Sequence, residues 1–333
     1  MLRFLGIRLL RALLTLLLVV SFAFIVLRLS GDPALLIMSA DAPPEAIAAF
    51  RRAWGLDDPL WVQYLRYFGA ILHGDLGQSM RDGRSAIELV AERVPATLAL
   101  TIPALLIKLC LGIPAGVYAA LHRNSWIDRG VMFLAVAGFT VPSFVLGLVL
   151  VLVFAVQLGW LPSGGQDSWR HAILPVITLG MGGAAVLARF TRSAMLEVLG
   201  QPYMRTALAK GVPWHAAVRR HALPNAAIPT VTIVGFMVGS LLAGAVVVES
   251  VFSWPGVGRL LVVAVANRDL AVVQCILLLV AATMVAANLV VDLLYGVLDP
   301  RLRVGAASAH SPSPWPALRR RAAPASCAAR CRC

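Results

Sequence analysis

The stretch Arg205-Thr206-Ala207-Leu208-Ala209-Lys210-Gly211-Val212-Pro213 lies within a basic segment, residues 189–225, between two long apolar runs. Further cationic side chains of this segment are Arg189, Arg192, Arg219 and Arg220. Gly211, Pro213 and Pro224 divide the segment into short helical pieces, because glycine and proline both end helices. In an apolar chain, such a segment marks the place where the polypeptide leaves the bilayer and meets another molecule.

The rest of the chain has the composition of a membrane protein. Its 333 residues are 59% hydrophobic and 14% charged, whereas soluble domains contain about 25% charged residues. The net charge of +13 does not indicate nucleic acid as a partner, because no run of Lys and Arg is interleaved with aromatic residues. Lysine and arginine in cytoplasmic loops account for most of this charge. We therefore expect an integral membrane protein in contact with the lipid bilayer.

Six apolar stretches are long enough to cross a bilayer as helices, which takes about 20 residues. They cover residues 9–29, 97–121, 131–157, 172–188, 228–248 and 272–297. The first resembles a signal peptide, but no small-residue cleavage site follows it, which favours an uncleaved helix within residues 1–29. The sequence thus predicts an all-α membrane protein with six transmembrane helices, five of them in a core domain over residues 97–300.

The distribution of Lys and Arg predicts the orientation of the helices. One side of the membrane would hold the basic segment and Arg3, Arg8, Arg11, Arg123, Arg129, Arg301 and Arg303. The short loops of the other side would hold Arg170, Arg259 and Arg268. Cytoplasmic loops are the ones enriched in Lys and Arg. Both termini and the basic segment are therefore predicted to face the cytoplasm.

Residues 30–96 predict a small helical cap on the outer face. Proline opens and glycine closes an amphipathic piece over residues 44–55, and a second piece over 60–72 has aromatic residues at helical spacing. We favour helix packing or interface anchoring over substrate contact for these aromatic residues.

The C-terminal residues 301–333 have a different character, rich in Ala, Ser, Pro and Arg without apolar periodicity. They predict a disordered basic tail, either without a role or bound to anionic lipid. Cys327, Cys331 and Cys333 form no C-x-x-C pair and have no histidine nearby, so no metal site is predicted there.

No enzyme signature is present in the sequence. A Gly-rich phosphate loop, a His-Glu-x-x-His motif and a nucleophile elbow are all absent. We therefore predict no catalytic, cofactor-binding or metal-binding residue, and an energy source outside this chain. A gradient-driven secondary transporter is the alternative, although it would require intramembrane acids and inverted repeats. Of the ionisable residues within the spans, Lys108 has no evident acidic partner and Asp292 lies near the end of the last span.

The basic segment resembles the cytoplasmic "EAA" loop of ABC importer permeases. The matching positions are Ala207, Gly211 and the terminal Leu223-Pro224, while Arg205 stands where the wider superfamily has Glu. Tyr203-Met204-Arg205-Thr206-Ala207 and Arg220-His221-Ala222-Leu223-Pro224-Asn225 are similar to the loop of the dipeptide/oligopeptide permease family, which also carries nickel and glutathione. Gly74-Asp75-Leu76-Gly77-Gln78-Ser79 and Glu249–Gly258 match the first of the two permease types of that family.

This resemblance implies a type I ABC importer permease in the bacterial plasma (inner) membrane. Its implied partners are a second permease subunit in a heterodimer, two cytoplasmic ATPases that bind ATP and Mg²⁺, and an extracytoplasmic solute-binding protein. The implied ATPase-coupling residues are Tyr203, Arg205, Thr206, Ala207, Lys210, Gly211, Leu223 and Pro224. The resemblance leaves peptide, glutathione, nickel complex and oligosaccharide open as substrate.

A second candidate site follows the fifth apolar stretch. Proline and glycine residues there allow irregular backbone at the outer edge of the membrane. We predict a gate or a binding-protein contact, with a plain tight turn as the alternative, at Phe252, Trp254, Pro255, Gly256 and Gly258.

Overall fold

The computed structural model describes residues 2–29, 34 and 42–298, which form helices, turns and an isolated β-bridge between Gln78 and Ser85. The helices are α1 (Leu2–Leu29), α3 (Pro44–Ala53), α4 (Leu60–Leu72), α5 (Ala86–Leu121), α6 (Trp126–Thr140), α7 (Ser143–Leu150), α8 (Arg170–Leu199), α9 (Pro202–Ala209), α10 (Trp214–Ala217), α11 (Leu223–Gly239), α12 (Val246–Val251), α13 (Val257–Ala266) and α14 (Leu270–Leu298). Two π-helical segments, Val151–Gln157 and Val218–Ala222, extend α7 and α10. The predicted tail over residues 301–333 lies outside the described residues.

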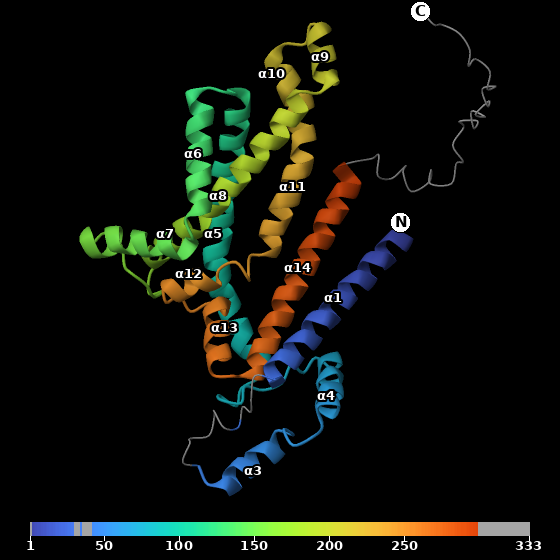
Figure 1. Cartoon of the computed structure of the whole chain (residues 1–333), viewed down its shortest axis with the longest axis vertical. Helices are drawn as coiled ribbons and strands as arrows, with labels where there is room; N and C mark the ends of the chain where they lie inside the picture. Colours follow the sequence, from blue (N-terminus) through green and yellow to red (C-terminus); the bar gives the residue numbers. More distant parts are fainter. Residues whose placement is uncertain (1, 30–33, 35–41, 299–333) are drawn as a thin grey trace, which may run out of the picture.

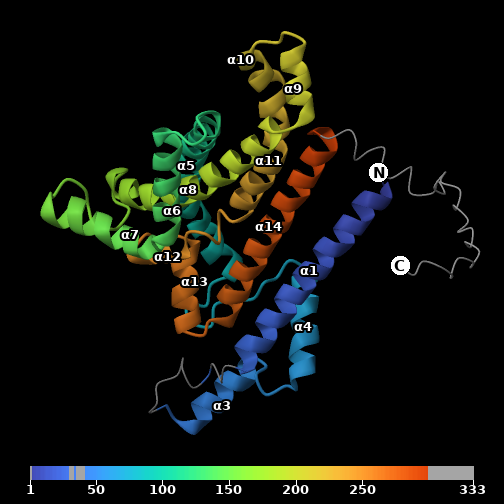
Figure 2. The same cartoon turned by 45° about the horizontal axis from the view of Figure 1, so that its top comes forward.

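The long helices run in roughly the same direction, with the short ones at their two ends (Figure 1). The α9 and α10 helices lie at one end of the molecule, and α3 and α4 lie at the opposite end. The beginning of α1 and the end of α14 point toward the end that carries α9 and α10, in both views (Figures 1 and 2). The long helices thus separate α9 and α10 from α3 and α4.

Within the described residues, four helices are long and apolar enough to cross a membrane, and a bent pair of helices makes a possible fifth. The four are α5, α8, the continuous α10–α11 stretch and α14. The α1 helix contains the shorter apolar run Leu10–Val26 and is 28 residues long. At about 1.5 Å per residue, α1 is about 42 Å long, more than the about 30 Å of a hydrocarbon core. Together these helices account for the six expected apolar stretches.

The third expected span, residues 131–157, is wrong as a single straight helix. It is divided into α6 and α7 with its π-helical extension, and the two parts meet at an angle of 98°. Val141 at the break has the extended backbone angles φ −76° and ψ 118°. Since Val141 precedes Pro142, the helical conformation is disfavoured at this position.

The fourth and fifth expected spans also have different ends in the structure. The α8 helix continues to Leu199, so Arg189 and Arg192 lie on a helix and the expected loop over residues 189–225 is shorter. Arg192 forms two hydrogen bonds with the buried Asp128 of α6, at 2.5 and 2.7 Å. In the fifth span, α11 already ends at Gly239. The turn that follows has buried residues, Leu242 and Ala245, beside the exposed Ala243 and Gly244, and its apolar composition resembled a continuing helix.

Helices α5 and α8 pack closely because glycine residues line their contact. A Cβ atom at Gly116 would lie 2.7 Å from Cβ of Thr191, and a Cβ atom at Gly112 would lie 2.9 Å from the carbonyl oxygen of Ala184. Small residues at helix contacts allow this close approach in membrane proteins. Lys108 packs its aliphatic stem against Gly183 of α8 in the same contact.

The two short helices predicted for the cap are confirmed as α3 and α4. Tyr64 of α4 packs edge-on against Phe24 of α1, with 5.5 Å between the ring centroids, and its hydroxyl forms a 2.8 Å hydrogen bond with Ser21. Ser79, in the segment after α4, donates a hydrogen bond to the carboxylate of Asp269 before α14. The α5 helix begins at Ala86, inside the segment 30–96 that was assigned to the cap.

Candidate functional site

The residues between α8 and α11 form a compact helical projection, which we call the bracket and define as residues 200–222. Its two short helices, α9 and α10, are joined by a tight turn at Gly211 and project beyond the long helices (Figure 2). The expected break into short helical pieces at Gly211 and Pro213 is therefore present.

Gly211 ends α9 in a left-handed conformation, with φ +82°. Its N–H donates to the carbonyl oxygen of Leu208 at 2.9 Å, and the N–H of Val212 donates to Ala207 at 3.2 Å. This pair of hydrogen bonds is the Schellman motif, which satisfies the last carbonyls of a helix. A Cβ atom at Gly211 would meet open space. Glycine is thus favoured here by the backbone conformation and not by crowding.

The inner face of the bracket is fixed to the ends of α5 and α8. Met204, Ala217, Val218 and Ala222 are buried in one apolar cluster together with Ala120 of α5 and Met195 of α8. Met204 is 1% exposed and Ala217 is fully buried. The inner face of the bracket is therefore closed to solvent by the ends of these two long helices.

The outer face of the bracket is exposed and combines apolar with cationic side chains. Tyr203 is 40% exposed, and Arg205, Thr206, Lys210 and Gly211 are also exposed, while Ala207 is half-buried. Partial burial raises the pKa of Tyr203, so its hydroxyl stays protonated at neutral pH. The structure thus brings these predicted residues together on α9 and the turn that ends it. Leu223 and Pro224 are exposed at the far end of the bracket, where α11 begins.

Two further exposed residues belong to this surface and were not among the predicted ones. Leu208 is 39% exposed and Trp214 is 49% exposed. Large apolar side chains in a polar, basic segment were the sequence signal that could have identified them, since exposed apolar patches mark interaction sites.

The second candidate segment, from Phe252 to Gly258, is packed into the interior. Phe252 is 1% exposed and Trp254 is 5% exposed, and the indole N–H of Trp254 donates to the carbonyl oxygen of Ala96 at 2.8 Å. These two side chains are not available to a binding protein in this conformation. The burial favours the alternative of a structural turn, and a role of this segment in gating stays a prediction.

The buried residue Glu249 explains the glycines of this segment. Its carboxylate accepts hydrogen bonds from the Thr97 hydroxyl at 2.7 Å and from the Arg259 N–H at 3.0 Å. The Thr97 hydroxyl in turn accepts from the Val257 N–H at 2.8 Å. Thr97 and Glu249 thereby satisfy free N–H groups at the start of α13, as capping side chains do. A Cβ atom at Gly256 would collide with the Glu249 carboxylate.

Comparison with protein families gives matches along nearly the whole chain. Residues 112–304 match the family model "Binding-protein-dependent transport system inner membrane component", and residues 1–101 match the N-terminal model of such membrane components. The bracket lies inside the first match.

Individual relatives and solved structures agree with these matches. The chain is 48% identical to the glutathione transport system permease protein GsiC of Salmonella paratyphi A over 297 residues, 89% of this chain and 97% of the relative. It is 47% identical to GsiC of Escherichia coli K12, over 83% of this chain and 90% of the relative. The inward-facing MetNI methionine ABC transporter covers 64% of this chain and 97% of its own, with a TM-score of 0.54 and 21% identity. This likeness shows a shared fold.

These matches decide against the gradient-driven alternative and confirm the expected fold class. The relatives are permease proteins of binding-protein-dependent transport systems, and permease subunits of such importers are not the catalytic ones. The chain belongs to the family of binding-protein-dependent transport system inner membrane components and is a permease subunit of an ABC importer.

Proposed function

We propose that this permease forms half of a translocation path for glutathione or similar short peptides. The supporting observation is the 48% identity over 97% of the length of a permease named for glutathione transport. The second half of the path would come from a different permease chain in a heterodimer. An extracytoplasmic binding protein would deliver the solute to the end of the molecule that carries α3 and α4.

The bracket is the proposed contact with the ATPase. Its outer face offers Tyr203, Arg205, Thr206, Lys210 and Gly211, while its inner face is packed against α5 and α8. A partner that binds this outer face can therefore move the two long helices as a unit. ATP and Mg²⁺ would be bound by two partner ATPases, which shift the permease between its conformations by binding one of them more tightly. Ala207 would contribute its backbone to the turn, and Leu223 and Pro224 the base of the bracket.

The bracket end of the molecule is the proposed cytoplasmic side of the plasma membrane. Arg123 in the α5–α6 connection and Arg129 in the first turn of α6 lie at this end, as do the beginning of α1 and the end of α14 (Figure 1). The enrichment of Lys and Arg at this end supports the orientation. Both termini would accordingly be cytoplasmic.

The substrate is tested by uptake into proteoliposomes that contain the complete importer and its binding protein. We expect ATP-dependent uptake of labelled glutathione that unlabelled glutathione competes away. A mass spectrum of the ligand retained by the purified binding protein gives a second measurement. Uptake of dipeptides but not of glutathione, with a dipeptide in the binding protein, would contradict the glutathione assignment.

A further inference from the structure

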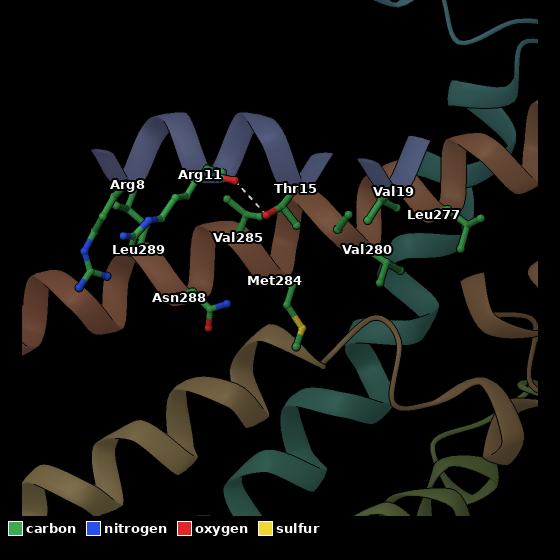
Figure 3. Close-up of a pocket in the computed structure, with 12 residues that line it drawn as sticks. Arg8, Arg11, Thr15, Val19, Leu277, Val280, Met284, Val285, Asn288 and Leu289 are labelled. Atoms are coloured by element: carbon green, nitrogen blue, oxygen red, sulfur yellow. Dashed lines mark hydrogen bonds between the residues drawn. The ribbon is translucent and has the colours of Figure 1, made fainter. Parts of the chain in front are cut away.

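A groove lies between α1 and α14 (Figure 3). The beginning of α1, which lines it, points toward the end of the molecule that carries the bracket (Figure 1). Its volume is about 560 Å³, within the range of about 300–1,000 Å³ typical of small-molecule sites. Most of its lining is apolar, including Ala12, Val19, Leu277 and Val280. The groove opens along α1 and α14.

Two arginine residues line one end of this groove. Arg8 and Arg11 are three residues apart on α1 and so lie on the same helix face, and both side chains reach toward α14 near Leu289 (Figure 3). None of the ion pairs among the described side chains involves Arg11. The hydroxyl of Thr15 in the groove donates to the carbonyl oxygen of Arg11 at 2.9 Å. The groove therefore has a cationic end and an apolar remainder.

The length of the groove corresponds to one leaflet of a bilayer. Along α1, the rise from Arg8 to Val19 is about 17 Å, and the rise from Leu277 to Leu289 along α14 is about 18 Å. Half of a hydrocarbon core is about 15 Å thick. A molecule bound with its anionic group at the arginines would thus have its acyl chain along the apolar part.

We propose that this groove binds an anionic phospholipid, with the headgroup phosphate at Arg8 and Arg11 and an acyl chain between α1 and α14. A phosphate accepts charge-assisted hydrogen bonds from guanidinium groups, and Arg matches its geometry with two parallel donors. Basic pockets between transmembrane helices bind such headgroups. A free phosphate ion would leave the apolar part of the groove uncovered.

Lipid binding is tested on the complete importer with phosphatidylglycerol and phosphatidylcholine as the two probes, measured by native mass spectrometry. We expect the wild-type complex to retain phosphatidylglycerol in preference to phosphatidylcholine. The variant R8Q/R11Q should lose roughly 10- to 30-fold in affinity for phosphatidylglycerol, as expected for two basic residues near a membrane surface. The control R123Q/R129Q removes the same charge at exposed positions on the same side and should bind like the wild type.

Two additional measurements separate lipid from protein as the occupant. The variant R8K/R11K keeps both charges without the two parallel donors and should recover part of the affinity. R8Q/R11Q should assemble with its partner subunits like the wild type, and this excludes unfolding as the cause of its weaker binding. A photo-reactive side chain at Ala281 should give an adduct of phospholipid mass. Equal binding of the two lipids, unchanged affinity in R8Q/R11Q, or an adduct with the partner permease at Ala281 would overturn the proposal.

Discussion

At the scale of single residues, the segment from Glu249 to Gly258 shows how a motif can be identified while its role is not. The sequence indicated that Phe252, Trp254, Gly256 and Gly258 belong together. It did not show that Glu249 is fully buried and that its carboxylate occupies the space beside Gly256. This arrangement depends on Thr97, which is far away in the sequence, and no local pattern contains that information.

Replacement of Thr97 by valine tests this hydrogen-bond network. Valine has a similar shape but cannot donate to Glu249 or accept from the Val257 N–H. Leaving buried polar groups without partners costs about 1–3 kcal/mol. We expect a lower apparent unfolding temperature of the purified complex and parallel losses of assembly and uptake. Thr97→Ser keeps the hydroxyl and should behave like the wild type. Loss of uptake with unchanged stability in Thr97→Val would instead favour a gate.

At the scale of helices, apolar length and composition predicted where α1, α5, α8 and α14 lie. They predicted less well where helices end and where they bend. Pro142 is a local signal for the 98° bend between α6 and α7, yet hydropathy alone joins the two parts into one span. After Gly239, the chain turns while Leu242 and Ala245 stay buried, so part of the turn is apolar. Burial by neighbouring helices has the same effect on composition as burial by lipid.

The glycine contact between α5 and α8 leads to a prediction about the packing of the core. In Gly116→Ala the added methyl group would approach the Cβ of Thr191 to 2.7 Å, so the helices must separate. Overpacking of this kind costs about 1–3 kcal/mol, and we expect a lower unfolding temperature of the purified complex. Gly130→Ala on α6 is the matched control, because a Cβ atom there meets nothing within 4 Å. Equal stability of the two variants would show that α5 and α8 tolerate a wider separation.

At the scale of the whole molecule, the bracket and the ends of α5 and α8 share one apolar cluster. The sequence predicted the Gly211 turn and the cations Arg205 and Lys210 beside it, because both are local properties. It could not separate the inner face of the bracket, with Met204 and Ala217, from the outer face, with Leu208 and Trp214. That division depends on the end of α5, which the sequence placed correctly at Leu121, and on the end of α8, which extends to Leu199 beyond the apolar run 172–188.

The central claim, that the bracket transmits force from an ATPase to the permease, is tested at Gly211. Proline there cannot adopt φ +82° and removes the N–H that donates to Leu208. Asparagine tolerates the left-handed conformation, and a side chain at this position meets open space. Gly211→Asn is therefore the matched control for Gly211→Pro.

The decisive measurement is the amount of solute taken up per ATP hydrolysed by the complete importer in proteoliposomes. For Gly211→Pro we expect this ratio to fall roughly tenfold or more with membrane insertion intact, because the turn that orients the outer face of the bracket cannot form with proline at this position. Gly211→Asn should keep most of the wild-type ratio. A normal ratio in Gly211→Pro would contradict the assignment of the bracket as the coupling element.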